Sequence, residues 1–504
     1  MSRRDSSEQP SAAVSSADRQ QGQDGHADAG NGNGAGASVS RRSFLRAAAA
    51  GAAVSVLPAC GRSDAVPQSP VKFAAGKPLP WINWSGNQSC TPALRLAPAS
   101  EAELVDALKR ASGVVRAVGA SHSFSAVVPT DGTLIATDLL SGLVGHDAAS
   151  LQAEIWAGTR MHALGPLLHG VGQAVPNMPD MDYPAMGGAI VNSVHGTGQR
   201  YGSMSSCVTA LTLATPSGEL IDCSATKHSE IFHAARTSVG ALGIVSRMTL
   251  QNDQPFRLVE TTRIEKTEDV LAELAQRCAA HRNFEFLPLP HSTLAVTVAT
   301  DLAGPNDTPA GEDDPEAVNS LRTLLQAVSW MPGMGEAAYD KLLTTFLAGG
   351  AAQVRVGHSF DVFPHVRVVR FREMEYTVPA ESGPDCVREI LRTIRERKLP
   401  IAFPLEYRYV KADDIWLSMF EGRDGCSISV HQYGDTDHRA YFAEIEPIFW
   451  KYQGRPHWGK LHTLDAARLA ALYPRHWKEF HEVRRSLDPQ GRMMNAHLKH
   501  IFGV

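Results

Sequence analysis

The clearest indication of the fold is the stretch R-A-V-G-A-S-H-S-F, residues 116–124. The β-branched run that leads into it predicts a short strand ending at Gly119. Small residues follow, so their backbone N–H groups can converge on an anion, as in other phosphate-binding turns. His122 lies inside this turn, where an imidazole can ligate, transfer a proton or form a covalent bond.

A second glycine-rich stretch, M-G-G-A-I-V-N-S-V-H-G-T-G, spans residues 186–198. Its glycines mark positions where a ligand or another part of the backbone comes close. Each stretch alone is weak evidence, because such turns are often merely structural. Together, about 70 residues apart in the chain, the two suggest one extended ligand that carries phosphate.

The surrounding residues predict an α+β fold with short strands. A helix is expected over 101–111, where apolar residues have helical spacing. Strands are expected over 114–118, 134–137, 153–157, 210–214, 366–376, 405–409 and 426–432, and after a glycine-broken turn within 239–250. They do not alternate regularly with long helices, which argues against a doubly wound sheet. The polar segment 303–315 predicts an exposed loop.

The length of 504 residues is too great for one core and suits two domains. We expect an export signal with a disordered extension over 1–60, a linker over 61–80, a first domain over 81–252, a second over 253–480, and a tail over 481–504 that packs back on the first domain. No internal repeat is visible.

Composition excludes several classes of protein. The net charge of −5 argues against a nucleic-acid partner, because phosphate binding needs a cationic face. Seven cysteines are too few for a disulfide scaffold and lack the paired spacing of a zinc site. The twenty histidines show no metal-binding spacing, so no metal is expected. No apolar run reaches the roughly 20 residues of a spanning helix.

The N-terminal residues resemble an export signal. The sequence S-R-R-S-F-L-R, residues 40–46, precedes an apolar segment over 47–57, the layout of a twin-arginine signal. The following L-P-A-C-G resembles a lipobox with Cys60 as the lipidated residue. An amphipathic surface helix is the alternative, but the alanine-rich run has no polar face. We therefore expect export in the folded state to the periplasmic face of a membrane, with contact through a lipid anchor on Cys60.

Several motifs occur in the order seen in a known flavoprotein superfamily. Residues 116–124 resemble the pyrophosphate loop of the vanillyl-alcohol oxidase and p-cresol methylhydroxylase (PCMH) superfamily, and 188–198 and 232–245 resemble its next two flavin-contacting motifs. The sequences P-L-E-Y-R at 404–408 and H-W-G-K at 457–460, with the tail 488–495, resemble the sugar-1,4-lactone oxidases and alditol oxidases. The resemblance implies an FAD-binding domain of PCMH type followed by an α+β substrate (cap) domain.

The resemblance also implies which residues hold FAD. His122 matches the histidine that bonds covalently to the flavin, the alternative being a histidine that only packs against the ring. The other implied contacts are Gly119, Ala120, Ser121, Ser123 and Phe124 around the diphosphate, and Ser193, Gly196, Thr197, Gly198 and Ile244 along the rest of the cofactor.

Glu406 and Arg408 lie two residues apart, so on a strand their side chains share one face. A surface ion pair would explain this spacing equally well. Oxidation of an alcohol or lactol needs an oriented hydroxyl and positive charge beside the flavin. With the resemblance, Arg408 and Lys460 take the electrostatic role and Glu406 orients the hydroxyl. His431 is a substrate contact or a proton acceptor, and the alternative is a structural histidine.

The implied activity is oxidation of a sugar-1,4-lactone or polyol by FAD, with O2 reduced to peroxide. Pro184 occupies a position where glycine or proline accompanies oxygen use in the family, which favours an oxidase. Ala185 stands where polyol oxidases usually have serine, which argues against a polyol substrate. Tyr433 stands where a smaller polar residue is common, which indicates a difference in substrate size. One alternative is a flavin dehydrogenase that passes electrons to a membrane carrier. The other is an inactive exported sugar-binding lipoprotein.

Overall fold

A computed structural model describes residues 79–312, 322–323, 336–346, 352–366 and 368–504. The predicted export signal, the lipobox cysteine Cys60 and most of the predicted linker lie outside this part of the chain, as do the last three residues of the predicted loop 303–315. Residues 71–504 form a single compact unit.

The strand that leads to the 119–124 turn is β4 (Val115–Val118), as predicted. It pairs in parallel with β5 (Thr133–Ala136), which also pairs with β3 (Leu94–Leu96). Helix α2 (Glu101–Arg110) precedes β4, and its Ser100 cap accepts a hydrogen bond from the N–H of Glu103 at 3.2 Å. A short hairpin of β1 (Trp81–Ile82) and β2 (Ser89–Cys90) begins this region.

A five-stranded antiparallel sheet follows, in the order β6-β7-β10-β8-β9. Its strands are β6 (Leu143–Asp147), β7 (Gln152–Trp156), β8 (Val208–Ala214), β9 (Leu220–Ser224) and β10 (Ile244–Gln251). The associated helices are α3 (Met161–His169), α4 (Met186–Val191) and α5 (Ser229–Ala235), with the 3₁₀ turn η1 (Met204–Cys207). Strands β6 and β9 were not predicted. They are the edge strands, and their largely exposed residues lack the apolar pattern of a buried strand.

The second half of the chain builds an eight-stranded sheet in the order β14-β11-β13-β12-β16-β17-β15-β18. Its strands are β11 (Arg257–Lys266), β12 (Asn283–Pro288), β13 (Leu294–Leu302), β14 (Gln353–His358), β15 (Phe371–Pro379), β16 (Glu406–Val410), β17 (Gly425–Tyr433) and β18 (Arg455–Pro456). The predicted strands at 405–409 and 426–432 are confirmed. The one predicted over 366–376 lies instead at Phe371–Pro379.

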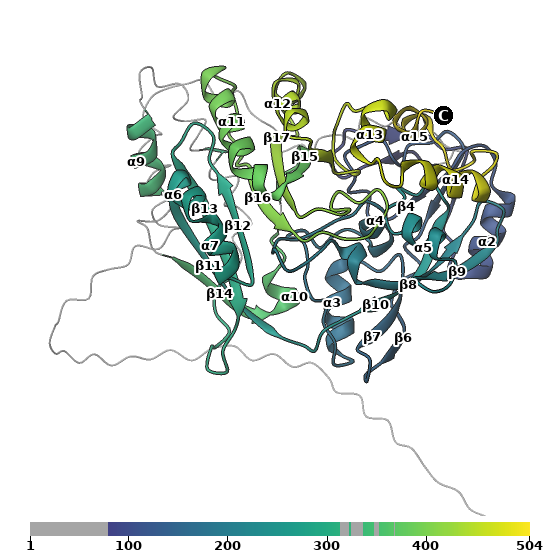
Figure 1. The fold of residues 1–504 in the computed structure, drawn as a ribbon. Coiled ribbons are helices and arrows are strands. Elements are labelled where there is room, and N and C mark those ends of the chain that lie inside the picture. Colours follow the sequence, from purple (N-terminus) through teal and green to yellow (C-terminus); the bar gives the residue numbers. More distant parts are fainter. Residues whose placement is uncertain (1–78, 313–321, 324–335, 347–351, 367) are drawn as a thin grey trace, which may run out of the picture. The chain divides into compact units, whose positions relative to one another are not determined.

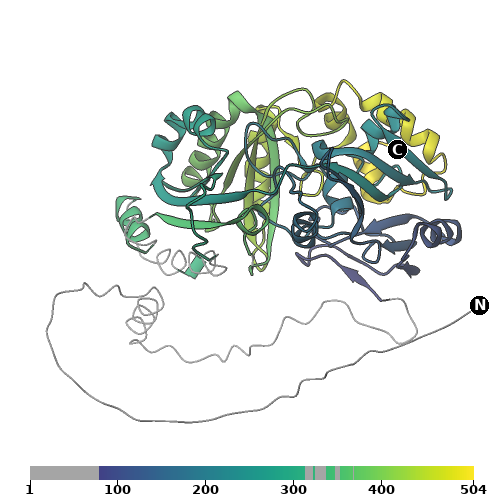
Figure 2. The ribbon, with the colours of Figure 1, turned by 90° about the horizontal axis from the view of Figure 1, so that it is seen from below.

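The helices of this half are α6 (Thr267–Ala272), α7 (Leu274–Ala280), α9 (Glu336–Phe346), α10 (Ser359–Val362), α11 (Gly383–Glu396) and α12 (Arg439–Lys451), with the 3₁₀ turn η2 (Ala380–Ser382). Figures 1 and 2 show the eight-stranded sheet beside the sheets formed by residues 81–251. Strand β17 is buried along its whole length, so the catalytic candidates near it stand in the interior.

The last residues of the chain contact the region around β4. Helices α13 (Ala466–Leu472) and α14 (Trp477–Leu487) precede a turn, and α15 (Ala496–Phe502) ends the chain. The N–H of Val115 donates to the carbonyl of Arg492 at 2.7 Å. Asn495 Nδ2 donates to the carbonyls of Ala126 and Pro129, both at 2.9 Å.

No helix in the described residues has the length and apolar character needed to cross a membrane. The six cysteines in this part of the chain are all free thiols.

Candidate functional site

A cavity lies between the 119–124 turn and strands β15, β16 and β17. The side nearer the N-terminal sheets is lined by Gly119, Ala120, Ser121, His122, Ser123, Phe124, Pro184, Ala185, Gly187, Gly188, Asn192, His195, Gly240 and Ile244. The side formed by the second half is lined by Phe371, Glu373, Glu375, Phe403, Glu406, Arg408, His431, His457, Gly459 and Lys460. The structure thus brings together the first predicted motif, Ile244 and all four predicted catalytic residues.

The 119–124 turn presents free backbone donors at this cavity. Trp84 donates its N–H to the carbonyl of Ser121 at 2.8 Å, and Trp81 Nε1 donates to the Ser121 hydroxyl at 2.9 Å. Phe124 donates its N–H to the carbonyl of Gly459 at 2.6 Å. The N–H groups of residues 119–123 have no acceptor in the described chain. Such a run of unsatisfied donors suits an anion, so the turn fits the diphosphate of FAD.

Gly119 is required by close packing at this turn. A Cβ at this position would lie 2.8 Å from the Cβ of Ala185, which precedes α4. Only glycine allows the turn and the segment before α4 to approach so closely.

The His122 ring is held on both faces by aromatic rings. Trp84 stacks on it with ring centroids 5.2 Å apart, and Tyr183 with centroids 5.9 Å apart. Burial, together with the positive charges of Arg160 and Lys460, lowers the pKa of His122 to about 4. The imidazole is therefore neutral at neutral pH and keeps a lone pair available for bond formation.

Four predicted cofactor contacts, Ser193, Gly196, Thr197 and Gly198, are not among the residues that line this cavity. Ser193 Oγ lies 3.3 Å from Ser418 Oγ, and the N–H of Gly198 donates to the carbonyl of Tyr409 at 2.8 Å. Gly196 and Thr197 line a separate small cavity.

A glycine in the sequence indicates that another group comes close to the backbone, but it does not identify that group. A Cβ at Gly196 would lie 2.3 Å from the carbonyl oxygen of Met178, so the close packing of the backbone by itself accounts for a glycine here. The segment reaches the cofactor cavity through other residues. Among them, Asn192 carries a buried Oδ1 without a partner, which is free to accept from a ligand.

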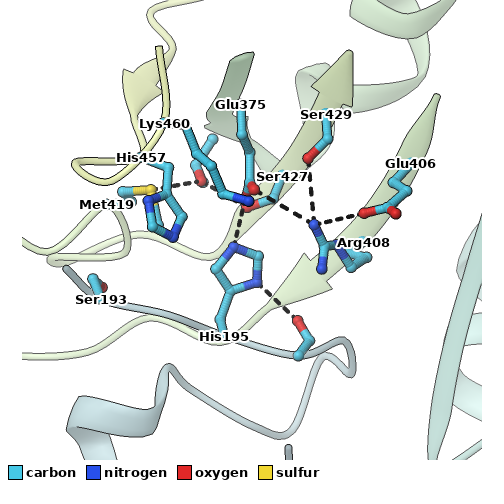
Figure 3. Close-up of polar contacts among 12 residues, drawn as sticks. Ser193, His195, Glu375, Glu406, Arg408, Met419, Ser427, Ser429, His457 and Lys460 are labelled. Carbon is cyan, nitrogen blue, oxygen red and sulfur yellow. Dashed lines mark hydrogen bonds and ion pairs between the residues drawn. The ribbon is translucent and has the colours of Figure 1, made fainter. Parts of the chain in front are cut away.

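Glu406 and Arg408 lie on one face of β16, as predicted, and they form an ion pair. Arg408 Nη2 lies 2.9 Å from Glu406 Oε2 and 3.3 Å from the Ser429 hydroxyl on β17 (Figure 3). Arg408 is only 5% exposed, so this is not the surface pair of the alternative interpretation. Burial opposes its charge, but Glu406, Glu375 and Asp180 raise the pKa of Arg408 above its ordinary value.

Lys460 and His431 meet at Glu373 on β15. Lys460 Nζ pairs with the Glu373 carboxylate and lies 5.1 Å from the centre of the Phe124 ring. His431 Nε2 is 3.6 Å from Glu373 Oε1, while its Nδ1 lies 3.2 Å from the carbonyl of Pro404. Although burial opposes it, Lys460 and His431 lower the pKa of Glu373 to about 2. Burial also opposes a charge on His431, yet Glu373 and Glu406 raise its pKa above the ordinary value.

One group of side chains at this wall has the geometry of a cation site. Ligand atoms of Glu373, Glu406 and His431 all lie within 4.8 Å of one another. Lys460 already pairs with the first carboxylate and Arg408 with the second, so protein cations supply the charge that a metal would bring.

The lining residues that were not predicted from the sequence include Glu373, Glu375, His195 and His457. The sequence does contain a signal for the two glutamates. The segment 371–379, F-R-E-M-E-Y-T-V-P, places two carboxylates two residues apart in a largely apolar strand. His457 and His195 stand in motifs that were quoted, but nothing local shows that they face a shared cavity.

The first half of the chain is similar to known FAD-binding proteins. A family model described as an FAD binding domain matches residues 92–224, the region that contains the 119–124 turn. The structure also resembles cholesterol oxidase from B. sterolicum with a TM-score of 0.68 over 84% of this chain and 96% of that one, at 15% identity, which shows the fold. The chain is an FAD-dependent oxidoreductase with the predicted α+β fold.

The second half of the chain matches a family model that identifies a narrower family. The model described as D-arabinono-1,4-lactone oxidase matches residues 248–501, so the chain belongs to this family. The L-gulono-1,4-lactone dehydrogenase of Mycobacterium tuberculosis is 34% identical, over 84% of this chain and 99% of that protein.

More distant relatives cover similar lengths. The L-gulonolactone oxidase of Bos taurus is 28% identical, over 84% of this chain and 99% of its own. The alditol oxidase of a Streptomyces species is 27% identical, over 83% of this chain and 98% of its own. An inactive binding protein is not favoured by these relationships.

Proposed function

We propose that this protein oxidises a CH–OH group of a sugar-1,4-lactone, or of a related alditol, with FAD. The observation that carries the proposal is the convergence of Glu406, Arg408 and Lys460 on the cavity that also contains the free N–H groups of the 119–124 turn. The names of the relatives, which act on 1,4-lactones and alditols, support this class of substrate.

The residues of the chain have distinct roles in this reaction. The 119–123 backbone and Ile244 would hold FAD, which when bound accepts a hydride and passes the electrons on to an acceptor. Glu406 orients the substrate hydroxyl, whose proton is released to solvent as the C–H bond breaks. Arg408 and Lys460 stabilise the negative charge that develops. Both His431 nitrogens face oxygen atoms of the protein, which favours the structural histidine over a proton acceptor.

A substrate panel under anaerobic conditions tests the proposal. Aldono-1,4-lactones and alditols are mixed with the holoenzyme, and loss of the flavin absorbance is recorded by stopped flow. We expect at least one lactone or alditol to reduce the flavin, with a two-electron-oxidised product. Failure of every lactone and alditol to do so would contradict the proposed substrate class.

We further propose that O2 is the electron acceptor. Pro184 lines the cavity, and it stands at the position where glycine or proline accompanies the use of oxygen in the family that this chain resembles. The 34% identical relative is named a dehydrogenase, so a membrane carrier is the competing acceptor. The reduced enzyme is mixed with air-saturated buffer. An oxidase regains its absorbance within seconds and releases one peroxide per flavin, whereas reduced enzyme that persists for minutes but reacts with a quinone supports the dehydrogenase.

We propose that His122 bonds covalently to FAD. Its neutral ring, its two stacking partners and its position in the cavity support this role. We expect a fluorescent flavin band in a denaturing gel, and its loss in His122→Ala. His162→Ala is a matched control because His162 packs against the edge of Tyr183, with ring centroids 5.9 Å apart. A fluorescent His122→Ala band would contradict the assignment.

We propose, from the sequence alone, export by the twin-arginine route and a lipid anchor on Cys60. Cell fractionation tests both. We expect the full-length protein in the membrane fraction, Cys60→Ala in the soluble exported fraction, and the double variant Arg41→Lys/Arg42→Lys in the cytoplasm. Cys90→Ala is the control for loss of a thiol. A Cys60→Ala protein that stays in the membrane fraction would overturn the anchor.

A further inference from the structure

A second buried charged pair, His195 and Glu375, stands beside Arg408 and has no role in the function proposed above. Both side chains are 1% exposed, and both residues line the cofactor cavity. His195 comes from the segment after α4, whereas Glu375 projects from β15 (Figure 3).

Both ring nitrogens of His195 face oxygen atoms. Nδ1 lies 2.8 Å from the carbonyl oxygen of Gly196, which can only accept, so Nδ1 carries a hydrogen. Nε2 lies 2.6 Å from Glu375 Oε1. Burial alone would raise the pKa of Glu375, but the neighbouring His195 and Arg408 hold it well below its ordinary value. Arg408 Nη2, 3.5 Å from the other oxygen of Glu375, favours the ionised carboxylate, which can only accept. With an acceptor facing each ring nitrogen, the geometry points to a hydrogen on both nitrogens of His195 and so to a positive charge.

The other oxygen of the same carboxylate reaches the catalytic strand. Glu375 Oε2 lies 3.5 Å from Arg408 Nη2, the nitrogen that also contacts Glu406 and Ser429. One carboxylate thus joins an imidazolium from the cofactor-binding side to the guanidinium on β16.

The other charged groups around His195 leave its positive charge in place. Burial lowers the pKa of His457, whose ring centroid is 6.1 Å from that of His195, to about 3, so His457 is neutral. Lys460 is paired with Glu373, the neighbouring carboxylate on β15. Glu375 is therefore the carboxylate that balances His195.

We propose that Glu375 and His195 form a positioning and charge-setting unit: Glu375 fixes Arg408 between two carboxylates and holds His195 as a further cation at the cofactor cavity. The positive charge of His195 then offsets the Glu375 carboxylate, which would otherwise oppose the negative charge that a reduced flavin carries. This inference rests on FAD occupying the cavity, but it does not depend on the identity of the sugar.

Sulfite affinity tests the charge of His195 without any sugar. Sulfite binds oxidised flavins better where positive charge is near, and its binding is read from the loss of flavin absorbance of the holoenzyme. His195→Gln leaves Glu375 unbalanced, so we expect the sulfite dissociation constant to rise about tenfold or more, because a unit charge a few ångströms away is weakly screened in the interior. We expect the flavin midpoint potential to fall in the same variant.

The double variant His195→Gln/Glu375→Gln separates charge from damage to the fold. It removes equal and opposite charges and leaves no unpaired buried ion, so it is expected to fold where a single variant fails. We expect its sulfite dissociation constant to return to within about threefold of the wild-type value. Glu375→Gln alone is expected to slow flavin reduction by about tenfold or more, since Arg408 loses one carboxylate, without weakening sulfite binding.

His281→Gln is the matched control, because His281 Nδ1 pairs with Asp301 Oδ2 at 2.6 Å and neither residue lines the cofactor cavity. Its sulfite affinity is expected to equal that of the wild type. Two results would overturn the proposal. One is a His195→Gln variant that binds sulfite as tightly as the wild type. The other is a double variant whose sulfite dissociation constant is no closer to the wild-type value than that of His195→Gln. An enzyme that reacts with no lactone but shows these sulfite shifts would contradict the proposed substrate and leave this inference standing.

Discussion

Arg116 Nη1 donates a 2.6 Å hydrogen bond to the carbonyl oxygen of Met493 and so joins the strand that leads to the cofactor turn to the C-terminal tail. The same guanidinium donates to the carbonyls of Val127 at 2.7 Å, Val239 at 2.6 Å and Gly240 at 2.9 Å. Burial lowers the pKa of Arg116 to about 10, which still leaves it charged at neutral pH. One buried side chain therefore holds four backbone segments together around the turn.

Replacement of Arg116 by methionine is expected to lower the free energy of unfolding by about 4 kcal/mol, because several buried carbonyls lose a charged donor at once. Urea denaturation followed by tryptophan fluorescence measures the change. Arg95→Met is the control, since Arg95 is exposed and donates to the carbonyl of Leu79 at 3.1 Å. Equal denaturation midpoints for the two variants would show that the network contributes little.

Gly119→Ala is expected to cost about 1–3 kcal/mol of stability and to lower the flavin content, because the new Cβ overlaps that of Ala185. The double variant Gly119→Ala/Ala185→Gly removes the overlapping atom, so we expect it to recover most of both losses. Thermal unfolding and the ratio of flavin to protein absorbance provide the measurements. Gly145→Ala is the control, since a Cβ there meets nothing within 4 Å. Without recovery in the double variant, the close approach is not the cause.

Arg408→Ala is expected to slow flavin reduction by substrate about 10²- to 10³-fold, the range for loss of one preorganised charge at a reacting centre. Anaerobic stopped flow gives the rate constant. Arg408→Lys keeps the charge but loses the planar fork between the carboxylates, so an intermediate rate is expected. The exposed Arg388→Ala on α11, which loses a pair with Glu268, serves as the control. Flavin reduction at the wild-type rate would remove Arg408 from the mechanism.

Covalent attachment of FAD to apoprotein is expected to be independent of pH from about 8 down to 5 and to fall below that, because the pKa of His122 is lowered to about 4. Above this pKa the ring is neutral and has a lone pair, and below it the lone pair is protonated. The rate is followed by acid-stable fluorescence in gels, with circular dichroism at each pH to confirm that the protein stays folded. A midpoint near 6.5, the ordinary value for histidine, would contradict the effect of burial.

Local signals in the sequence predicted the first half of the site well. Strand β4 and the turn after it follow from a β-branched run that stops at a glycine. The pairing of Glu406 with Arg408 follows from the period of two along a strand. Both features depend on residues close in the chain, so neighbouring residues suffice to predict them.

The same kind of signal was ambiguous at Gly196 and Gly198. A glycine-rich segment indicates that another group approaches closely, and at Gly196 the carbonyl of Met178 does so. The edge strands β6 and β9 were missed for a related reason, because exposed strands carry little apolar pattern.

Residues distant in sequence meet only when the chain folds. His195 and Glu375 are 180 positions apart, and Lys460 and Glu373 are 87 apart, yet each pair is in contact within the cavity. Strand and turn chemistry is a property of adjacent residues, so sequence alone could define the cofactor turn, the family and the catalytic strand. The charge balance around Arg408 is a property of the packed sheets, because antiparallel pairing of β15, β16 and β17 places their carboxylates, cations and histidines on one wall.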